Sequence, residues 1–379
     1  MLNGLYTRRA EVSLRNEQDA VAELASKLHM EKMGAVIFFC SADYDLMKLG
    51  TAIDKTFSCP VVGCTTAGEI CSTYGNGGIV AVSFSSEAFR FHSLLIERLH
   101  EVEFETMNSK VHDLEESLEF SKGFDPEKMF GFLLIDGLSI MEETVTAALY
   151  SALRGVSIIG GSAGDSLKFK ETSVFANGRF VTNAAVLTIV ETLLPFKTFK
   201  LQHFVPSDKE MVITEADSFK RIVYEIDGGP AAEEYAEIIG LKAEELTSQI
   251  FAMYPVMLQI GDDWYVRSIE KVNDDGSLTF FCAIDNGLPL TVAEGVGLVE
   301  TLKEKVEEIQ REFPSIELTL GYDCILRRLE INEKNKSKEV EAELNKINFI
   351  GFSTFGEQFN SIHVNQTLTG VVFGSELQA

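Results

Sequence analysis

A short pattern that occurs three times limits what this chain can fold into. Each copy is an apolar run that enters a loop with glycines and one acid: Val62-Gly63-Cys-Thr-Thr-Ala-Gly68-Glu69, Ile159-Gly160-Gly-Ser-Ala-Gly164-Asp165 and Gly351-Phe-Ser-Thr-Phe-Gly356-Glu357. Short apolar runs that stop at glycine are typical of buried strands. Three copies in one chain indicate a repeated structural unit rather than unrelated turns.

The residues before each copy predict the same order of elements. An apolar strand comes first, at residues 35–40, 130–136 and 316–322, and a helix follows it, at residues 43–57, 140–153 and 324–333. These lengths suit strand–helix–strand crossovers between parallel strands. Further β-prone strands follow the loops, at residues 79–84, 182–190 and 366–373. We therefore predict an α/β protein with mixed sheets built from repeated strand–helix–strand–glycine loop–strand units.

Two domains are predicted, at residues 1–215 and 216–379. The length of 379 residues suits two or three domains, and the boundary is placed between Pro206 and Ile222. The second domain begins with a helix at Ala231–Ile239 and a hairpin across the turn at residues 273–276.

The charge and the cysteines exclude several classes of protein. Acids outnumber bases 58 to 33, so the net charge of −25 argues against binding a nucleic-acid backbone or an anionic membrane. Six cysteines occur without a Cys-x-x-Cys pair, which argues against a zinc knuckle or a disulfide framework. No apolar run approaches the ~20 residues that span a bilayer, and no signal peptide is visible, so we expect a cytoplasmic protein.

The sequence shows no catalytic set, and we predict that the chain is not an enzyme. Gly160-Gly-Ser162-Ala-Gly164 matches the letters of a hydrolase nucleophile elbow. An elbow should enter a helix, whereas this string leads into further β-like sequence. The loops also lack the Gly-Lys-Ser/Thr of a phosphate loop, so their glycines either permit close backbone approach or face a ligand.

Two strings near the C-terminus carry the candidate binding residues. His363 lies in the segment after the third glycine loop, with Asn365 close by, and no two histidines have the His-x-x-x-His spacing of a helical metal site. Cys324 precedes Arg327 and Arg328 at the start of a predicted helix, where the helix dipole and the arginines would stabilise a thiolate. The arginines could instead pair with acids.

Together these strings resemble the FIST sensory family over most of the chain. The N-terminal likeness rests on the first two glycine loops. The C-terminal likeness rests on four strings: Ile226-Asp-Gly-Gly-Pro230-Ala231, Tyr265-Val-Arg267-Ser268, Asp323-Cys324-Ile-Leu-Arg327 and the third glycine loop. The resemblance implies a ligand-binding module of signal transduction.

One branch of that family is formed by stand-alone haem proteins that sense nitric oxide (NosP) and regulate a separate histidine kinase. This chain looks like that branch, since its sequence shows no kinase, cyclase or methyl-accepting segment. The resemblance then implies haem as cofactor, His363 as its axial ligand with His203 as the second choice, and Arg327 or Arg328 at the propionates. A histidine kinase in trans would be the partner, and a homo-oligomer is a further possibility.

The alternative is a sensor of a small ligand such as an amino acid, without haem. Arg327 or Arg267 would then bind the carboxylate and Glu69 or Glu357 the amine. An interaction module without a small ligand is a third class. The ligand-binding residues expected in either sensor are Cys324, Arg327, Arg328, Gly356, Glu357 and Asn365. An apolar pocket around His363 would favour haem, and a polar pocket lined by arginine and glutamate would favour an amino acid.

Overall fold

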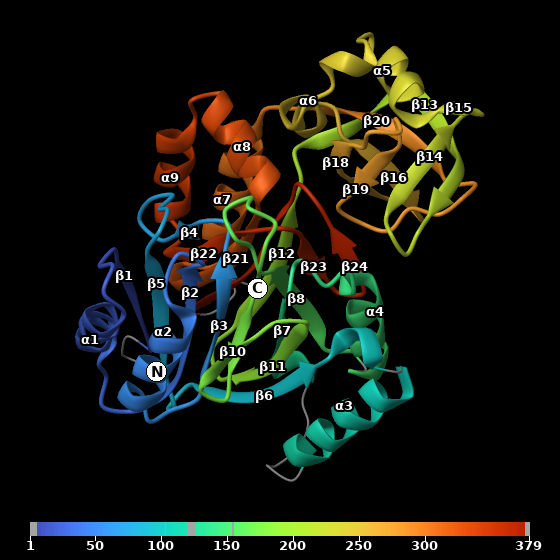
Figure 1. Ribbon diagram of the computed structural model, residues 1–379. Coiled ribbons are helices and arrows are strands. Elements are labelled where there is room, and N and C mark those ends of the chain that lie inside the picture. The colour runs from blue at the N-terminus through green and yellow to red at the C-terminus, as the bar shows by residue number, and fades with distance from the viewer. Residues whose placement is uncertain (1–5, 103, 120–125, 154, 376–379) are drawn as a thin grey trace.

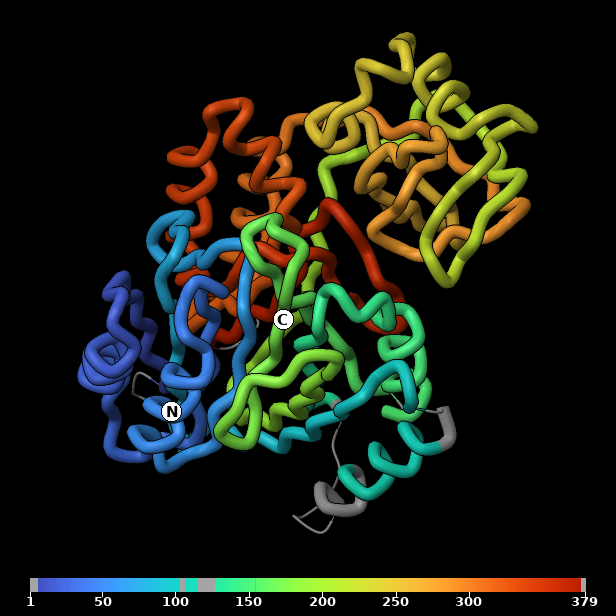
Figure 2. The backbone as a smooth tube through the Cα atoms, viewed as in Figure 1, coloured from blue at the N-terminus to red at the C-terminus, as the bar shows by residue number. Residues whose placement is uncertain are grey.

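The computed structural model describes residues 6–102, 104–119, 126–153 and 155–375. It has a body of three α/β units and a smaller domain, residues 204–296, inserted into the third unit (Figure 1). The inserted domain, drawn in yellow and orange, lies beside one end of the body. The backbone tube in Figure 2 shows one red stretch of the chain between the two, whereas the chain end marked C lies over the body.

The three units share one arrangement of strands. In each, a strand, a helical segment and a second strand form a parallel crossover, and a later strand pairs antiparallel with the first. In chain order the elements are β2 (Met33–Ser41), α2 (Leu46–Thr56), β3 (Val61–Thr66) and β5 (Ile79–Ser85); β7 (Met129–Ile135), α4 (Glu142–Ala152), β8 (Ser157–Ser162) and β11 (Ala184–Thr192); and β21 (Ser315–Cys324), α8 (Ile325–Glu333), α9 (Ser337–Asn345), β22 (Phe349–Thr354) and β25 (Leu368–Ser375).

Each unit also has a strand and a helix ahead of this crossover. The strand pairs antiparallel with the last strand of its own unit, so it forms the sheet edge. These elements are β1 (Thr7–Val12) and α1 (Glu17–Leu28), β6 (Phe89–Glu97) and α3 (Phe104–Glu119), and β12 (Phe196–Leu201) and α7 (Leu298–Glu312).

The strands that follow the glycine loops tie the units into a ring. β4 (Glu69–Ile70) of the first unit pairs with β22 of the third, and β23 (Glu357–Phe359) of the third pairs with β8 of the second. β9 (Val174–Ala176) of the second pairs with β3 of the first. Each unit therefore completes the sheet of a neighbour, and β9 continues into a hairpin with β10 (Arg179–Val181).

The glycine loops lie where the three sheets meet. Ala67 N donates to Ser353 O over 2.9 Å, and Phe355 N donates to Ser162 O over 3.2 Å, so each loop is bonded to another unit. A Cβ on Gly164 would stand 2.6 Å from Ala67 N. Glycine is needed there because two backbones approach closely. One apolar core cluster takes residues from all three sheets, among them Phe39, Phe132 and Phe352.

The inserted domain is one antiparallel sheet with two short helices. Its chain leaves the body after β12 and returns at α7, and Val296 N donates to His203 O over 2.8 Å where the two crossings run side by side. Its elements are β13 (Phe204–Asp217), β14 (Ile222–Ile226), β15 (Gly229–Pro230), α5 (Ala231–Ile239), α6 (Ser248–Met253), β16 (Val256–Ile260), β17 (Asp263–Arg267), β18 (Ile269–Val272), β19 (Leu278–Phe280) and β20 (Pro289–Gly295).

The predicted class, an α/β protein with repeated units and mixed sheets in two domains, is confirmed. The α5 helix has the predicted bounds, and the hairpin across the turn at residues 273–276 forms between β18 and β19. The division at residues 215 and 216 stays a prediction; residue 215 lies within β13, and the third unit packs with the first two. None of the described helices is both long and apolar enough to cross a membrane.

Candidate functional site

A cleft of about 630 Å³ lies between the second unit and the inserted domain. We call it the interdomain cleft. One wall is the segment that joins β7 to α4, with the start of α4 and His100, and the other is the β13–β14 turn with the segment after β19. Its lining residues are His100, Ser139, Ile140, Met141, Glu143 and Thr144 from the body, and Ser218, Phe219, Arg221, Ala283 and Asp285 from the inserted domain.

The floor of the cleft is an ion-pair cluster that joins the two domains. Arg221 Nη2 donates to Glu142 Oε2 and to Glu143 Oε2, both over 2.6 Å. Arg221 Nη1 donates to the Phe281 carbonyl over 2.9 Å, while its buried Nε has no hydrogen-bond partner among the described residues. Burial favours the neutral form of Glu143, yet its pKa is lowered because His363, Arg221 and the Ala283 N–H stabilise the carboxylate. The cleft thus holds a cation and a carboxylate.

The rim of the cleft combines apolar and strained residues. Ile140 has a φ of 55°, which is rare for a β-branched residue, and its side chain is half exposed. Phe219 is 91% exposed at the tip of the β13–β14 turn. Met141 and His100 complete the rim on the body side. A ligand with an apolar part could contact these side chains while its polar groups reached the floor.

A thin wall separates this cleft from His363. Ala283 N donates to Glu143 Oε1 over 2.7 Å, and the carbonyl of Phe281 lies 3.3 Å from His363 Nε2. The wall, residues 281–283, therefore contacts the cleft on one side and the histidine on the other.

The structure buries His363, the metal ligand expected from the sequence. Its side chain is 1% exposed, and its Nδ1 lies 3.4 Å from Gln358 Nε2. A Cβ on Gly356 would stand 2.2 Å from its Cε1. Burial lowers the pKa of His363, against the nearby carboxylates of Glu143 and Glu142, which raise it. A haem iron would reach Nε2 only after the Phe281 carbonyl moved away.

The hairpin of β23 and β24 (Ile362–Val364) is held by the inserted domain. Arg267 Nη1 donates to the His363 carbonyl over 3.0 Å, and Ser268 N donates to Asn365 Oδ1 over 3.4 Å. Several buried polar atoms nearby have no partner among the described residues, and such atoms usually bind ordered water or a ligand. They are Arg267 Nε, Ser268 Oγ, Gln358 Oε1, Asn365 Nδ2 and both amide atoms of Gln366.

The three loop acids hold their own loops. Glu69 accepts from Thr66 Oγ1 over 2.6 Å, and Asp165 accepts from Lys170 N over 2.7 Å. Glu357 accepts from Thr354 Oγ1 and, over 2.7 Å, from Thr367 Oγ1. Burial raises the pKa of Glu357 to about 8. These contacts give each acid a structural role in the described conformation.

The residues around Cys324 form buried protein contacts. Arg327 Nε pairs with Asp323 Oδ1 over 2.6 Å, with both side chains fully buried, and Arg328 Nη2 donates to the Gly75 carbonyl over 2.7 Å. The expectation of a stabilised thiolate at Cys324 was wrong: burial, and then the nearby Glu357, raise its pKa well above the ordinary value. For Arg327, pairing with an acid is what the structure shows.

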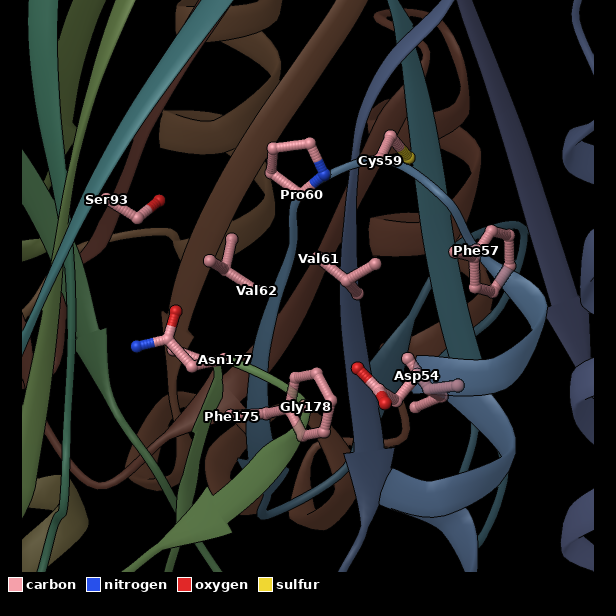
Figure 3. Close-up of a pocket in the computed structure, with 12 residues that line it drawn as sticks. Asp54, Phe57, Cys59, Pro60, Val61, Val62, Ser93, Phe175, Asn177 and Gly178 are labelled. Atoms are coloured by element: carbon pink, nitrogen blue, oxygen red, sulfur yellow. The ribbon is translucent and has the colours of Figure 1, made fainter.

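A separate pocket of about 260 Å³ opens at the amino end of β3, away from the glycine loops (Figure 3). Cys59 and Pro60 lie in its lining, opposite Asn177 and Gly178 of the β9–β10 turn. Burial raises the pKa of the Cys59 thiol. Among the described residues, no group of three or more His, Cys, Asp or Glu is arranged to hold a metal ion.

The structure brings some of the residues expected from the sequence together, and it also places in the site residues that the sequence did not indicate. Gly356, Glu357, His363 and Asn365 lie together, as their spacing suggested, and Glu357 is near Cys324. Sequence reasoning missed Arg221, Glu143 and His100. Arg221 and Glu142 stand 79 positions apart, and nothing in either local string marks them as partners.

Comparisons with known proteins identify two regions. A model of the FIST N domain matches residues 34–229, and a model of the FIST C domain matches residues 231–360. An uncharacterized protein of Methanocaldococcus jannaschii is 23% identical over an alignment of 371 residues, and the alignment covers 87% of this chain and 70% of that protein.

Proposed function

The chain belongs to the family built from FIST N and FIST C domains, which are sensory domains of signal transduction, and from this premise we propose that it senses a small zwitterionic ligand of the amino-acid type. The proposed binding site is the interdomain cleft. The observation that carries the proposal is the meeting of Arg221 and Glu143 on its floor, with Arg221 Nε unpartnered.

Each end of an amino acid has a counterpart in this cleft. The Nε–H of Arg221 is buried and unpartnered, and it would suit a carboxylate oxygen that reached it from the cleft, because guanidinium groups bind carboxylates through charge-assisted hydrogen bonds. Glu143 suits the ammonium group, since its two oxygens keep lone pairs beyond those used by Ala283 N and Arg221. Ile140, Met141 and Phe219 would contact an apolar side chain.

The cleft lies between two domains, so a ligand in it would contact both. The wall at residues 281–283 passes any displacement to His363, whose strand pairs with β23 and through it with β8 of the second unit. A ligand that favours one relative position of the domains would shift the population of that position. We propose that a separate histidine kinase reads this change, as the family resemblance implies.

Thermal unfolding with each of the amino acids tests the proposal. A bound ligand raises Tm by mass action, with a stabilisation of about 2.7 kcal/mol at 100 times Kd. Arg221→Lys keeps the positive charge but removes Nε–H, and Glu143→Gln removes the carboxylate; both should abolish the shift. Arg179→Met is the matched control, because Arg179 pairs with Glu97 at the exposed surface. A wild-type protein that no amino acid stabilises would refute this function.

Haem with nitric-oxide sensing is the second candidate, and His100 is the observation that favours it. His100 is exposed and lines the interdomain cleft together with Met141, whereas His363 is enclosed by protein atoms. A histidine and a methionine are a known axial pair for haem iron. Haem titration of His100→Ala and His363→Ala distinguishes the two positions. If the wild type shows a saturating Soret band and only one variant loses it, the histidine replaced in that variant is the axial ligand of the iron. Broad, non-saturating absorbance in the wild type excludes haem.

A further inference from the structure

A second cleft, of about 510 Å³, lies on another side of the junction between the body and the inserted domain. We call it the lysine cleft. Its walls come from β12 and α7 of the body, β17 of the inserted domain and the β23–β24 turn. Lys197, Lys200 and Lys305 line it together with the rings of Tyr150, Tyr265 and Phe359. Two carboxylates, Asp263 and Glu308, also line the cleft.

Lys200 differs from the other two lysines in having no anionic partner. Lys197 pairs with Glu312 over 2.5 Å, and Lys305 pairs with Glu308 over 2.5 Å. No carboxylate of the described residues lies within 4.0 Å of Lys200 Nζ, although Asp263 stands near enough to raise its pKa. The ammonium lies instead over the Tyr265 ring, 4.1 Å from the centroid, with the Phe359 ring centroid at 6.0 Å.

The position of Lys200 on β12 makes the absence of a counter-charge energetically costly. Alternation along β12 places it on the same strand face as Phe196, which packs against the central core. The side chain is half buried, and burial lowers its pKa. An ammonium removed from water without a counter-charge is unfavourable, and a cation–π contact offsets only part of that cost. A bound anion would supply the missing partner.

We infer that the lysine cleft binds a small aromatic anion, an aryl carboxylate or aryl phosphate, whose charged group pairs with Lys200. The volume is within the range of small-molecule sites. The rings of Tyr265, Phe359 and Tyr150 provide apolar surfaces for an aromatic body. The occupant would contact Asn360 and Ser361, in the turn that leads to His363, so it would act on the same hairpin as the interdomain cleft. The inference does not depend on the amino-acid ligand.

Calorimetric titration of the full chain with benzoate and phenyl phosphate tests it. Benzyl alcohol lacks the charge and should bind at least about tenfold more weakly, the effect expected for one charge-assisted contact. Inorganic phosphate keeps the charge but lacks the ring, so it should also bind more weakly, because the aromatic contacts are lost. Lys200→Met should remove binding of the aromatic anions, and Lys200→Arg should retain it. Lys48→Met is the control, because Lys48 pairs with Asp45 at the exposed surface of α2 and does not line this cleft.

Two results would contradict binding of an aromatic anion at Lys200. No saturable binding of either aromatic anion to the wild type, or binding that survives Lys200→Met, would overturn the inference. If Lys200→Met does not fold, Tyr265→Leu keeps the test, since it removes the ring beneath the ammonium and should weaken binding at least about tenfold. The amino-acid response of the interdomain cleft should persist in Lys200→Met, so failure of one site is distinguishable from failure of the other.

Discussion

His203 Nε2 and Glu330 Oε2 are 2.8 Å apart, and this hydrogen bond ties the strand that enters the inserted domain to helix α8 of the body. On the other side of the ring, Arg327 Nη1 donates to His203 Nδ1 over 2.9 Å, so Nε2 carries the proton of the neutral ring. Arg327 continues to Asp323, and Tyr74 OH donates to the same Asp323 carboxylate. The root of the inserted domain is thus held by a buried polar chain that reaches the first unit.

His203→Ala should destabilise the protein strongly. The substitution leaves the buried groups of Glu330 and Arg327 without their shared partner, and breaking a buried charged contact costs about 3–5 kcal/mol. Urea unfolding of the variant and the wild type measures the loss. His29→Ala is the control, since His29 is exposed at the end of α1 and its loss should change stability by no more than about 0.5 kcal/mol. Equal effects in the two variants would contradict the role of the chain.

The repeated unit was predictable from the sequence because its determinants are local. Asn177 and Gly178 have φ of 52° and 78°, the left-handed values that their dipeptide favours in a hairpin turn. The turn joins β9 to β10, whereas the strand predicted at residues 182–190 is β11, which pairs with β6 and β7. Helix α2 begins at Leu46 and not at the predicted Asp43, because the Asp45 side chain caps the helix by accepting from Lys48 N. Helix α7 was missed, although Leu298, Leu302, Val306 and Ile309 have helical spacing and are buried.

The pairing between units was not predictable in this way. β4 consists of two residues, Glu69 and Ile70, and its partner β22 lies in the third unit. No local propensity selects that partner, since it depends on how the three sheets close. The same holds for the interdomain cleft, where Arg221 meets Glu143 only because the inserted domain folds back on α4. Spacing could place His363 beside Gly356, but it could not show that the imidazole would be enclosed.

Stability should depend on the ionisation of Glu357. Its folded pKa of about 8 lies above the ordinary 4.5, so the folded state binds more protons than the unfolded state between these values. The contribution of Glu357 to the free energy of unfolding is therefore fully present below about pH 4.5. It is lost as the pH rises towards 8, by at most ~1.4 kcal/mol per pH unit. Glu357→Gln should flatten this part of the Tm–pH profile.

The profile is measured by thermal unfolding at pH 5.5 to 8.5. Glu23→Gln, at a half-exposed position in α1 where Glu23 pairs with Lys27, should leave the wild-type slope unchanged. A slope that is the same in Glu357→Gln and in the wild type would show that other groups cause it.

Gly356→Ala should disturb the hairpin that carries His363. The new methyl group would stand 2.2 Å from His363 Cε1 and 2.7 Å from Nε2, so the ring must move. Overpacking of this kind costs about 1–3 kcal/mol. Gly295→Ala is the control, because its nearest contact is the Phe204 side chain at an ordinary 3.4 Å. Thermal unfolding compares the two, and a variant at position 356 as stable as the control would mean that the histidine is less enclosed than described.

Thiol labelling reports whether the two domains stay closed in solution. Cys59 is half buried, and the other five cysteines, all within the described residues, are buried. Burial raises the pKa of each thiol, which lowers the thiolate available for reaction. The native protein should therefore react slowly with about one equivalent of a disulfide reagent, at Cys59, and Cys59→Ser should abolish that reaction. Unfolded protein exposes every thiol.

Cys282 lies in the wall between the interdomain cleft and His363, and Cys324 lies at the start of α8. Rapid labelling of Cys282 in Cys59→Ser would mean that the wall opens spontaneously. Protection that increases when an amino acid is added would then measure the closing of the domains on the ligand.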